Sequence, residues 1–306
     1  MNQNTRMLIQ CLVNGDVTRA KSYAAIVLKN ESTKKDTQFC TEMLRKLESK
    51  PNLIELPYNL KELLVAEDSA LFPVDKYFLR ESDKEVADYI MRLYKAAGKL
   101  ASMGISYLPA AIFHGQSGCG KTELARYIAH AAELPFIYVR FSNVVGSLLG
   151  STQSNVGKIF QYAKTTPCVL CFDEIDAVGM CRGQKNDVGE MNRIVIALMQ
   201  ELDQLPNNVI IIGTTNRFDR LDPALIRRFP TQYEVKPLDM DEAIGMARRF
   251  FEYAGVADKV TDWWNSYLIR ELGKNDATPA SAVVKLCTDK IVSMIVNGEI
   301  EKDEED

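Results

Sequence analysis

The feature that most constrains this chain of 306 residues is a glycine-rich turn between an apolar run and a helical pattern. Residues 110–113 form the apolar run, and residues 115–122, which read GQSGCGKT, fit the spacing G-x-x-x-x-G-K-[ST]. Beyond the turn, apolar residues recur on one helical face: Leu124, Ala125, Ile128, Ala131 and Ala132. A strand, a glycine-rich turn and a helix in this order predict a phosphate-binding loop; the alternative is a chance match in a turn.

The residue types in this turn suit phosphate. Glycines at three positions let the backbone turn tightly, so that successive N–H groups can face phosphate oxygens, and the positive end of the following helix adds to that field. Lys121 would lie between the β- and γ-phosphates, and the Thr122 hydroxyl would hold Mg²⁺. We therefore expect the whole loop to bind a nucleotide: Gly115, Gln116, Ser117, Gly118, Cys119, Gly120, Lys121 and Thr122.

Composition narrows the class of protein. A hydrophobic content of 46% with 25% charged residues is typical of a soluble globular chain. The net charge of −4 argues against a protein that coats nucleic acid by bulk charge, although a local basic groove stays open. There is no run near the roughly 18 apolar residues of a spanning helix, and the first residues lack a signal-peptide pattern. Seven cysteines suit a reducing compartment, so we expect a cytoplasmic protein without membrane contact.

Strand-like and helical patterns alternate through the middle of the chain. Because strands that alternate with helices build parallel sheets, they predict an α/β fold with a doubly wound, mostly parallel sheet. After Pro237 only helical patterns remain, and Asp239 with Glu242 resembles a capping box. The expected strands are 110–113, 135–141, 168–172, 209–212 and 233–235.

The same patterns suggest domain boundaries. Residues 1–50 predict a short helical unit, which either docks a partner or packs on the main domain. Residues 51–81 contain prolines and no clear period, which is typical of a linker or an extended segment. The expected parts that follow are an α/β core over 82–237, a helical domain over 238–297 and an acidic, disordered tail over 298–306.

Two carboxylates follow the apolar residues 169–172 directly. At the C-terminal end of a parallel strand, Asp173 and Glu174 would reach the crevice where open α/β sheets bind ligands. Asp173 is then placed to hold Mg²⁺, and Glu174 to act as the general base on an attacking water. The alternative is a solvated acidic turn, and the presence of the phosphate loop favours the functional interpretation.

Two further signals follow the next apolar strand. Asn216 stands where a buried strand ends in polar residues, so it can bond to both a γ-phosphate oxygen and the water. Arg227 and Arg228 follow a short helical pattern, and two adjacent guanidinium groups can hold phosphate in a bidentate manner. Taken alone, the arginines also fit an ordinary exposed turn.

The order and spacing of these four motifs resemble the AAA+ ATPases, and within them the AAA group proper, over about residues 82–296. The resemblance implies a P-loop NTPase core with a small helical lid, and hydrolysis of ATP with Mg²⁺. The adjacent Arg227 and Arg228 are similar to the paired arginine fingers of the katanin, spastin and Vps-type ATPases. That similarity implies that they complete a neighbouring subunit's site in a homo-oligomer, usually a hexameric ring.

The resemblance also implies a substrate-gripping pore loop at Leu148 and Leu149; the alternative for Leu148 is a buried packing leucine. Three positions differ from the family pattern or bear on its subgroup. Cys119 replaces the more usual threonine and would put a thiol beside the phosphates. Arg140 stands where a polar switch residue is common. The residues 280–282, read ASA, correspond to a small-residue motif at the start of the last helix.

These features leave three functions open. The favoured one is an ATPase ring that remodels or unfolds a protein substrate, with or without a separately encoded partner protein. The alternatives are a DNA-associated AAA+ helper, such as a helicase loader or transposition regulator, and a slow nucleotide-gated scaffold. The acidic isoelectric point near 5.5 and the combination of motifs do not favour nucleic acid.

Overall fold

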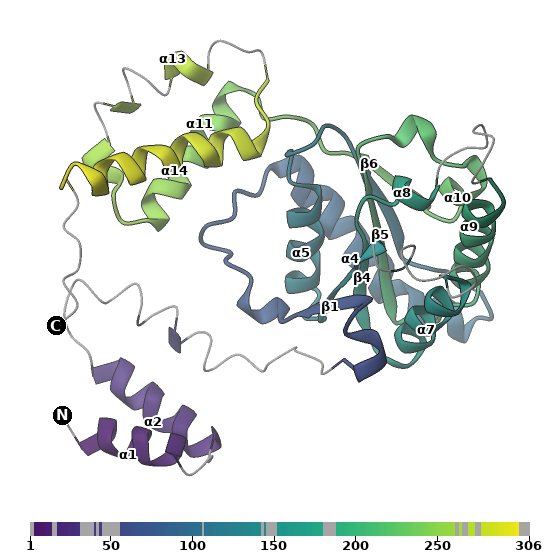
Figure 1. The fold of residues 1–306 in the computed structure, drawn as a ribbon, viewed down its shortest axis with the longest axis horizontal. Coiled ribbons are helices and arrows are strands. Elements are labelled where there is room, and N and C mark those ends of the chain that lie inside the picture. The colour runs from purple at the N-terminus through teal and green to yellow at the C-terminus, as the bar shows by residue number, and fades with distance from the viewer. Residues whose placement is uncertain are drawn as a thin grey trace. The chain divides into compact units, whose positions relative to one another are not determined.

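The computed structural model divides into two units, Met1–Asn52 and Leu53–Asp306. In the first unit, α1 (Gln3–Val13) and α2 (Val17–Asn30) contact each other. The second unit contains a sheet and further helices (Figure 1). The structure describes residues 3–13, 17–30, 40, 43–44, 56–105, 107–141, 144, 152–179, 188–260, 263–264, 269–272 and 277–299.

The sheet of the second unit has six strands in the order β1-β3-β4-β5-β2-β6. All neighbouring pairs are parallel except β1 and β3, which run antiparallel. The expected doubly wound, mostly parallel α/β fold is therefore confirmed. The strands are β1 (Leu64–Glu67), β2 (Ala110–His114), β3 (Phe136–Val139), β4 (Cys168–Phe172), β5 (Val209–Thr215) and β6 (Thr231–Glu234).

Two apolar clusters cover the two faces of this sheet. Successive strand residues point to opposite faces, so Ile112 joins one cluster and Phe113 the other. The first face packs against α7 (Thr152–Thr165) and α9 (Val188–Leu202), and the second against α4 (Glu81–Ser102) and α5 (Lys121–Ala131) (Figure 1). Because both faces are covered, β4 and β5 are buried along their whole length.

The segment before α4 differs from the expected linker. Leu64 begins β1, is 1% exposed and pairs with Val139 of β3. The short helical turns η1 (Tyr58–Leu60) and η2 (Ser69–Leu71) flank this strand, and Leu60 and Phe72 are also buried. The segment is thus part of the α/β domain. The four residues of β1 read LVAE and do not alternate between apolar and polar, so the usual period-2 signal of a strand is missing.

The helical part after β6 is built on α11 (Met240–Tyr253) and α14 (Ala280–Val296), with η4 (Ala257–Val260) and α13 (Ile269–Leu272). The capping box at the start of α11 is present: the Glu242 N–H donates to the Asp239 carboxylate at 2.8 Å, and the Asp239 N–H donates to the Glu242 carboxylate at 3.1 Å. Ala247, Phe251, Val283 and Cys287 lie in the buried core of this lid.

Several expectations fall on residues outside those described. These are Leu148 and Leu149 of the expected pore loop and residues 300–306 of the acidic tail. The domain boundaries stay predictions. Among the helices that the structure describes, none is both long enough and apolar enough to cross a membrane.

Candidate nucleotide site

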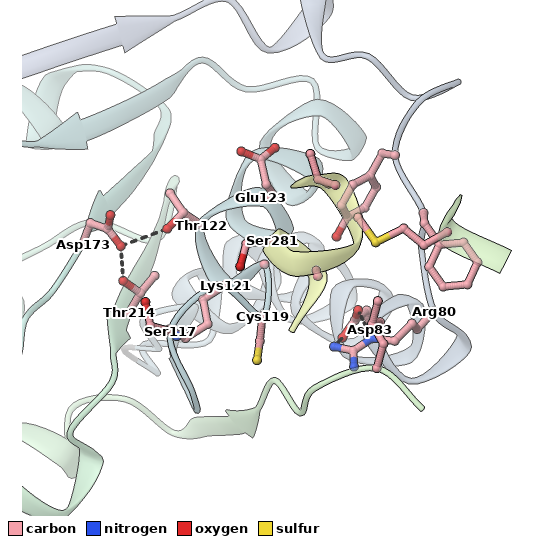
Figure 2. A pocket seen from close by; sticks show the side chains of 18 of the residues that line it. Arg80, Asp83, Ser117, Cys119, Lys121, Thr122, Glu123, Asp173, Thr214 and Ser281 are labelled. Carbon is pink, nitrogen blue, oxygen red and sulfur yellow. Dashed lines mark hydrogen bonds and ion pairs between the residues drawn. The ribbon is translucent and has the colours of Figure 1, made fainter. Parts of the chain in front are cut away.

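A cavity of about 620 Å³ lies between the carboxyl ends of the strands and the lid. Its volume is within the usual range for small-molecule and cofactor sites. Figure 2 shows Asp173, Thr122 and Thr214 together on one side of the site, and the Ser281 N–H of the lid donates to the Gly118 carbonyl of the loop. The lining comes from residues 117–123 of the phosphate loop and α5, from Asp173, Glu174 and residues 214–216, from residues 72–83, and from α11 and α14.

The loop backbone favours glycine at three positions. Gly115, Gly118 and Gly120 have φ angles of 133°, 80° and 97°, a region that other residues disfavour. A Cβ at Gly118 would overlap the Ser281 hydroxyl oxygen, and one at Gly115 would overlap the Val235 carbonyl oxygen. Helix α5 begins at Lys121, directly after the loop, so its unpaired N-terminal N–H groups face the same region. The loop therefore has the backbone shape that a phosphate cradle needs.

The ammonium of Lys121 joins the loop to Asn216. Its Nζ donates to the Gly115 carbonyl at 2.9 Å, to the Gln116 carbonyl at 2.8 Å and to Asn216 Oδ1 at 2.7 Å. Burial lowers the pKa of Lys121, an effect that the nearby Cys119 and Asp173 oppose. The structure thus brings together two residues that stand 95 positions apart in the chain.

Thr122 and Asp173 also meet, as a metal site would need. The Thr122 hydroxyl donates to Asp173 Oδ1 at 3.0 Å, and the Thr214 hydroxyl donates to the same oxygen (Figure 2). Hydroxyl and carboxylate oxygens are the hard ligands that Mg²⁺ prefers. Within the described residues, no cluster of three or more His, Cys, Asp or Glu side chains could hold a metal. Mg²⁺ commonly takes one or two protein ligands plus phosphate and water, so this pair fits it.

Glu174 follows Asp173 in the chain, and it is an exposed residue that lines the cavity. Its backbone lies in the left-handed region, with φ at 52°, and its N–H donates to the Thr214 hydroxyl at 3.2 Å. This region is unfavourable for a residue with a side chain by roughly 1–2 kcal/mol, and the bond to Thr214 helps to hold it. The carboxylate therefore stands at the open edge of the cavity, where an attacking water would approach.

The thiol of Cys119 is buried, although the residue is among those that line the cavity. Only 4% of the residue is exposed, and its side chain belongs to the apolar cluster under α4 and α5. In Figure 2 the sulfur points away from the Thr122–Asp173 pair. Burial raises the pKa of Cys119, although Lys121 and Arg80 oppose this effect. The residue can offer its backbone N–H to phosphate, but its thiol packs beneath the loop.

The two arginines lie away from the cavity of their own chain. Arg227 and Arg228 follow α10 (Pro223–Ile226), which Asp222 caps, and neither is among the lining residues. Arg228 pairs with Asp203, with 3.0 Å between Nη2 and Oδ2, and it also donates to the Ala224 carbonyl at 2.8 Å. Arg227 has no ion pair within the part of the chain that the structure describes.

Two groups at this site were not predicted from the sequence. Arg80 and Asp83 form a buried ion pair at 2.7 Å at the start of α4, and the Tyr233 hydroxyl donates to Asp83 at 2.8 Å. Tyr138 donates its hydroxyl to Asp173 Oδ2 at 3.2 Å. The signal available in the sequence for Tyr138 was a hydroxyl-bearing side chain on β3, the strand beside β4. For the Arg80–Asp83 pair, the i,i+3 spacing of opposite charges was visible but is common on exposed helices.

The lid contacts the loop and the segment before α4. The Ser281 N–H, in the first turn of α14, donates to the Gly118 carbonyl at 2.9 Å. Arg249 of α11 donates to the carbonyls of Val74 and Asp75, both at 2.9 Å. The small-residue motif of residues 280–282 therefore lies directly against the phosphate loop.

A glycine-rich loop before a helix, a carboxylate at the end of β4, which β5 separates from the loop's own strand β2, and a helical lid define a P-loop nucleoside triphosphatase. Comparison with known proteins agrees: the family described as ATPase family associated with various cellular activities (AAA) matches residues 111–237. The "Uncharacterized AAA family ATPase y4kL" of Sinorhizobium fredii is 30% identical over 230 residues, which are 72% of this chain and 69% of that protein. The chain belongs to the AAA family of ATPases.

Two peroxisomal ATPases are also similar over the same type of domain. Human PEX6 is 37% identical over 153 residues, which are 49% of this chain and 15% of PEX6. The pex6 protein of Schizosaccharomyces pombe is 35% identical over 153 residues, 48% of this chain and 16% of that protein. This chain thus spans only a small part of these longer relatives.

Proposed function

We propose that this protein hydrolyses ATP with Mg²⁺ and uses the energy to remodel or unfold a protein substrate as an oligomeric, hexameric ring. The observation that carries the hydrolytic part is the meeting of Lys121, Thr122, Asp173 and Asn216 around one cavity under the lid. Membership of the AAA family supports the coupling to a protein substrate.

Each group has a role in such a reaction. Lys121, released from its present partners, and the loop N–H groups would hold the β- and γ-phosphates, while Thr122 and Asp173 would hold the metal. Bound Mg²⁺ would supply charge neutralisation of the phosphates. Glu174 accepts the proton of the attacking water, and Asn216 orients that water from the neighbouring strand end. Positioning and electrostatic stabilisation are the main sources of rate in this chemistry.

The remaining charge would come from the next subunit. Arg227 and Arg228 lie outside their own cavity and would reach the neighbour's γ-phosphate in a ring. Arg228 would have to exchange its bond to Asp203 for that contact. Arginine fingers supplied in trans contribute on the order of 10³–10⁵ in rate, so the dilute monomer should be a weak ATPase.

Force would reach the substrate through the lid and the pore loop. The bond between Ser281 and Gly118 makes the lid sensitive to the loop's conformation. In this proposal, hydrolysis tilts the lid, and Leu148 with Leu149 moves a bound polypeptide along the pore.

Replacement of Glu174 by Gln tests the hydrolytic part. Gln keeps the shape of the side chain but is not a base, so ATP should bind with unchanged affinity while turnover falls by at least about 10². Nucleotide binding and phosphate release would be measured on the same preparation. Full turnover in Glu174→Gln would show that another group activates the water.

The same variant tests the substrate. Held with ATP, Glu174→Gln should form stable assemblies that retain a polypeptide after purification, and these would be identified by mass spectrometry. Recovery of bound nucleic acid would instead support a DNA-associated helper. Assemblies that hold nothing, together with slow turnover in the wild type, would support a nucleotide-gated scaffold.

A further inference from the structure

The carboxylate of Asp173 accepts hydrogen bonds from hydroxyl groups of three different elements. Thr122 of α5 and Thr214 of β5 donate to Oδ1, and Tyr138 of β3 donates to Oδ2 at 3.2 Å. Tyr138 is thus the one residue of the three that contacts the second carboxylate oxygen. It belongs to neither the phosphate loop nor the strand that ends in Asn216.

The sheet register accounts for this contact. Strands β3 and β4 are parallel, with Tyr138 opposite Cys171 and Val139 opposite Phe172. Side chains alternate along a strand, and Tyr138 packs with the cluster under α5, the helix that also carries Thr122. The tyrosine ring therefore supports the end of β4 from the side on which the phosphate loop lies.

Arg140 does not make this contact. It lies one residue beyond β3, is exposed, and its backbone N–H donates to the Leu63 carbonyl at 2.9 Å. The family resemblance implies that the polar switch position of the second strand falls at Arg140. On this strand, the hydrogen bond to the acidic residues of the site comes from Tyr138 instead.

The contact has a specific consequence for a metal ligand. The terminal torsion of an aspartate has broad energy wells, so its carboxylate plane is set by its hydrogen-bond partners. Once the Thr122 hydroxyl turns to a metal, Thr214 and Tyr138 are the donors that stay, and each holds a different oxygen. Together they fix the plane of the carboxylate, which one donor alone would not do.

We propose that Tyr138 is a positioning residue for the metal site, which holds Asp173 through Oδ2 so that Oδ1 stays directed at Thr122. The inference rests on the proposed Mg²⁺-ATPase function. It assigns Tyr138 to the metal-dependent part of nucleotide binding and leaves the phosphate loop's own contacts unaffected.

The test is Tyr138→Phe, made in a Glu174→Gln protein so that no ATP is consumed. A fluorescent ATP analogue would be titrated first in EDTA and then at rising Mg²⁺ concentration. We expect the affinity in EDTA to be unchanged. Mg²⁺ should raise the affinity for the analogue, and the Mg²⁺ concentration that gives half of this increase should be roughly tenfold higher in Tyr138→Phe. Loss of a hydrogen-bond partner of a metal ligand typically has an effect of this size. The affinity for Mn²⁺ in the presence of ATP, measured by electron paramagnetic resonance, should fall in parallel.

Tyr162→Phe is the matched control, because Tyr162 packs in the apolar cluster on the opposite face of the sheet. This variant should keep the parent's Mg²⁺ requirement. If the parent responds to Mg²⁺ and Tyr138→Phe has the same Mg²⁺ requirement, the inference about Tyr138 would be overturned, while the proposed function would stand. Weaker binding in EDTA would also overturn it, since Tyr138 would then support the loop as a whole. A parent that gains no affinity from Mg²⁺ would overturn the proposed function as well.

Discussion

Single residues in this site are held by hydrogen bonds that a ligand would have to replace. Lys121 gives its three N–H groups to two loop carbonyls and Asn216, so phosphate binding exchanges these bonds for contacts with an anion. Charge-assisted bonds are roughly twice as strong as neutral ones, which favours the exchange. In the proposed reaction, the same event would release Asn216, which would then be free to orient water. The position of one ammonium group thus links nucleotide binding to the residue that would arrange the attack.

Cys119 gives a prediction at the same scale. Its thiol is buried and its pKa is raised, so at neutral pH less of it is the reactive thiolate than in a free cysteine. Iodoacetamide should therefore label it slowly, with or without ATP, and faster as the pH rises toward that raised pKa. Peptide mass mapping would follow this site separately from the other cysteines.

Unfolding in urea is the control for this experiment, because the exposed thiol should then react at the rate of a free cysteine. Rapid labelling of the folded protein that ATP blocks would contradict the structure. It would place the thiol beside the phosphates, where the sequence had suggested it.

Among the elements, those with long apolar patterns could be predicted from the sequence. The run at 168–172 is β4 to the residue, and the last helix, expected to start at residues 280–282, is α14, which begins at Ala280. Both succeed because burial on both faces, or a long 3.6-residue period, leaves a strong signal. The motif spacing also predicted that Lys121, Asp173 and Asn216 approach one cavity, because parallel strands end at the same edge of a sheet.

Other parts depend on contacts between distant segments and left little local signal. Strand β1 is four residues long at the sheet edge, and its place is set by pairing with β3. Thr214 and Tyr138 act on Asp173 only because of strand order and register. The thiol of Cys119 turns into the core because α4 supplies an apolar surface there, which loop spacing alone does not indicate.

The segment that the sequence predicts to be a linker can be tested directly. Leu64→Ala removes a side chain that is 1% exposed, so it should lower the free energy of unfolding by about 2–5 kcal/mol. Leu71→Ala, in the same segment but 44% exposed, should change it by less than about 1 kcal/mol. Urea unfolding would measure both. Equal, small effects would mean that the segment is a linker after all.

At the scale of the whole molecule, the site is shared between parts that must move together. The cavity is lined by the α/β domain and the lid, and the two arginines lie outside it. In the proposed ring, each chain therefore holds a nucleotide with one surface and serves a neighbour's nucleotide with another. Activity then belongs to the assembly, and it should rise with protein concentration.

Mixing two inactive variants tests this sharing. Glu174→Gln keeps its arginines but lacks the base, whereas the double variant Arg227→Ala, Arg228→Ala keeps the base but lacks the arginines. Glu174→Gln alone should lose at least about 10² in turnover, and the double arginine variant about 10³ or more. A mixture should recover activity, because one chain completes the other's site. Phosphate release at fixed total protein would be measured across mixing ratios.

Asp203→Asn is the matched control for the double variant, because it breaks the Arg228–Asp203 pair while both arginines stay. It should leave most of the turnover intact. A mixture no more active than its components would argue against arginines that act between subunits.

The strength of the hydrogen bond from the Ser281 N–H to the Gly118 carbonyl determines how long this contact lasts. A single hydrogen bond of this kind contributes about 1 kcal/mol, a factor of about five in an equilibrium. A contact so weak breaks and re-forms many times within one slow catalytic cycle. The Arg249 bonds to the Val74 and Asp75 carbonyls would hold the lid meanwhile, so a bound nucleotide would act by changing how often α14 touches the phosphate loop.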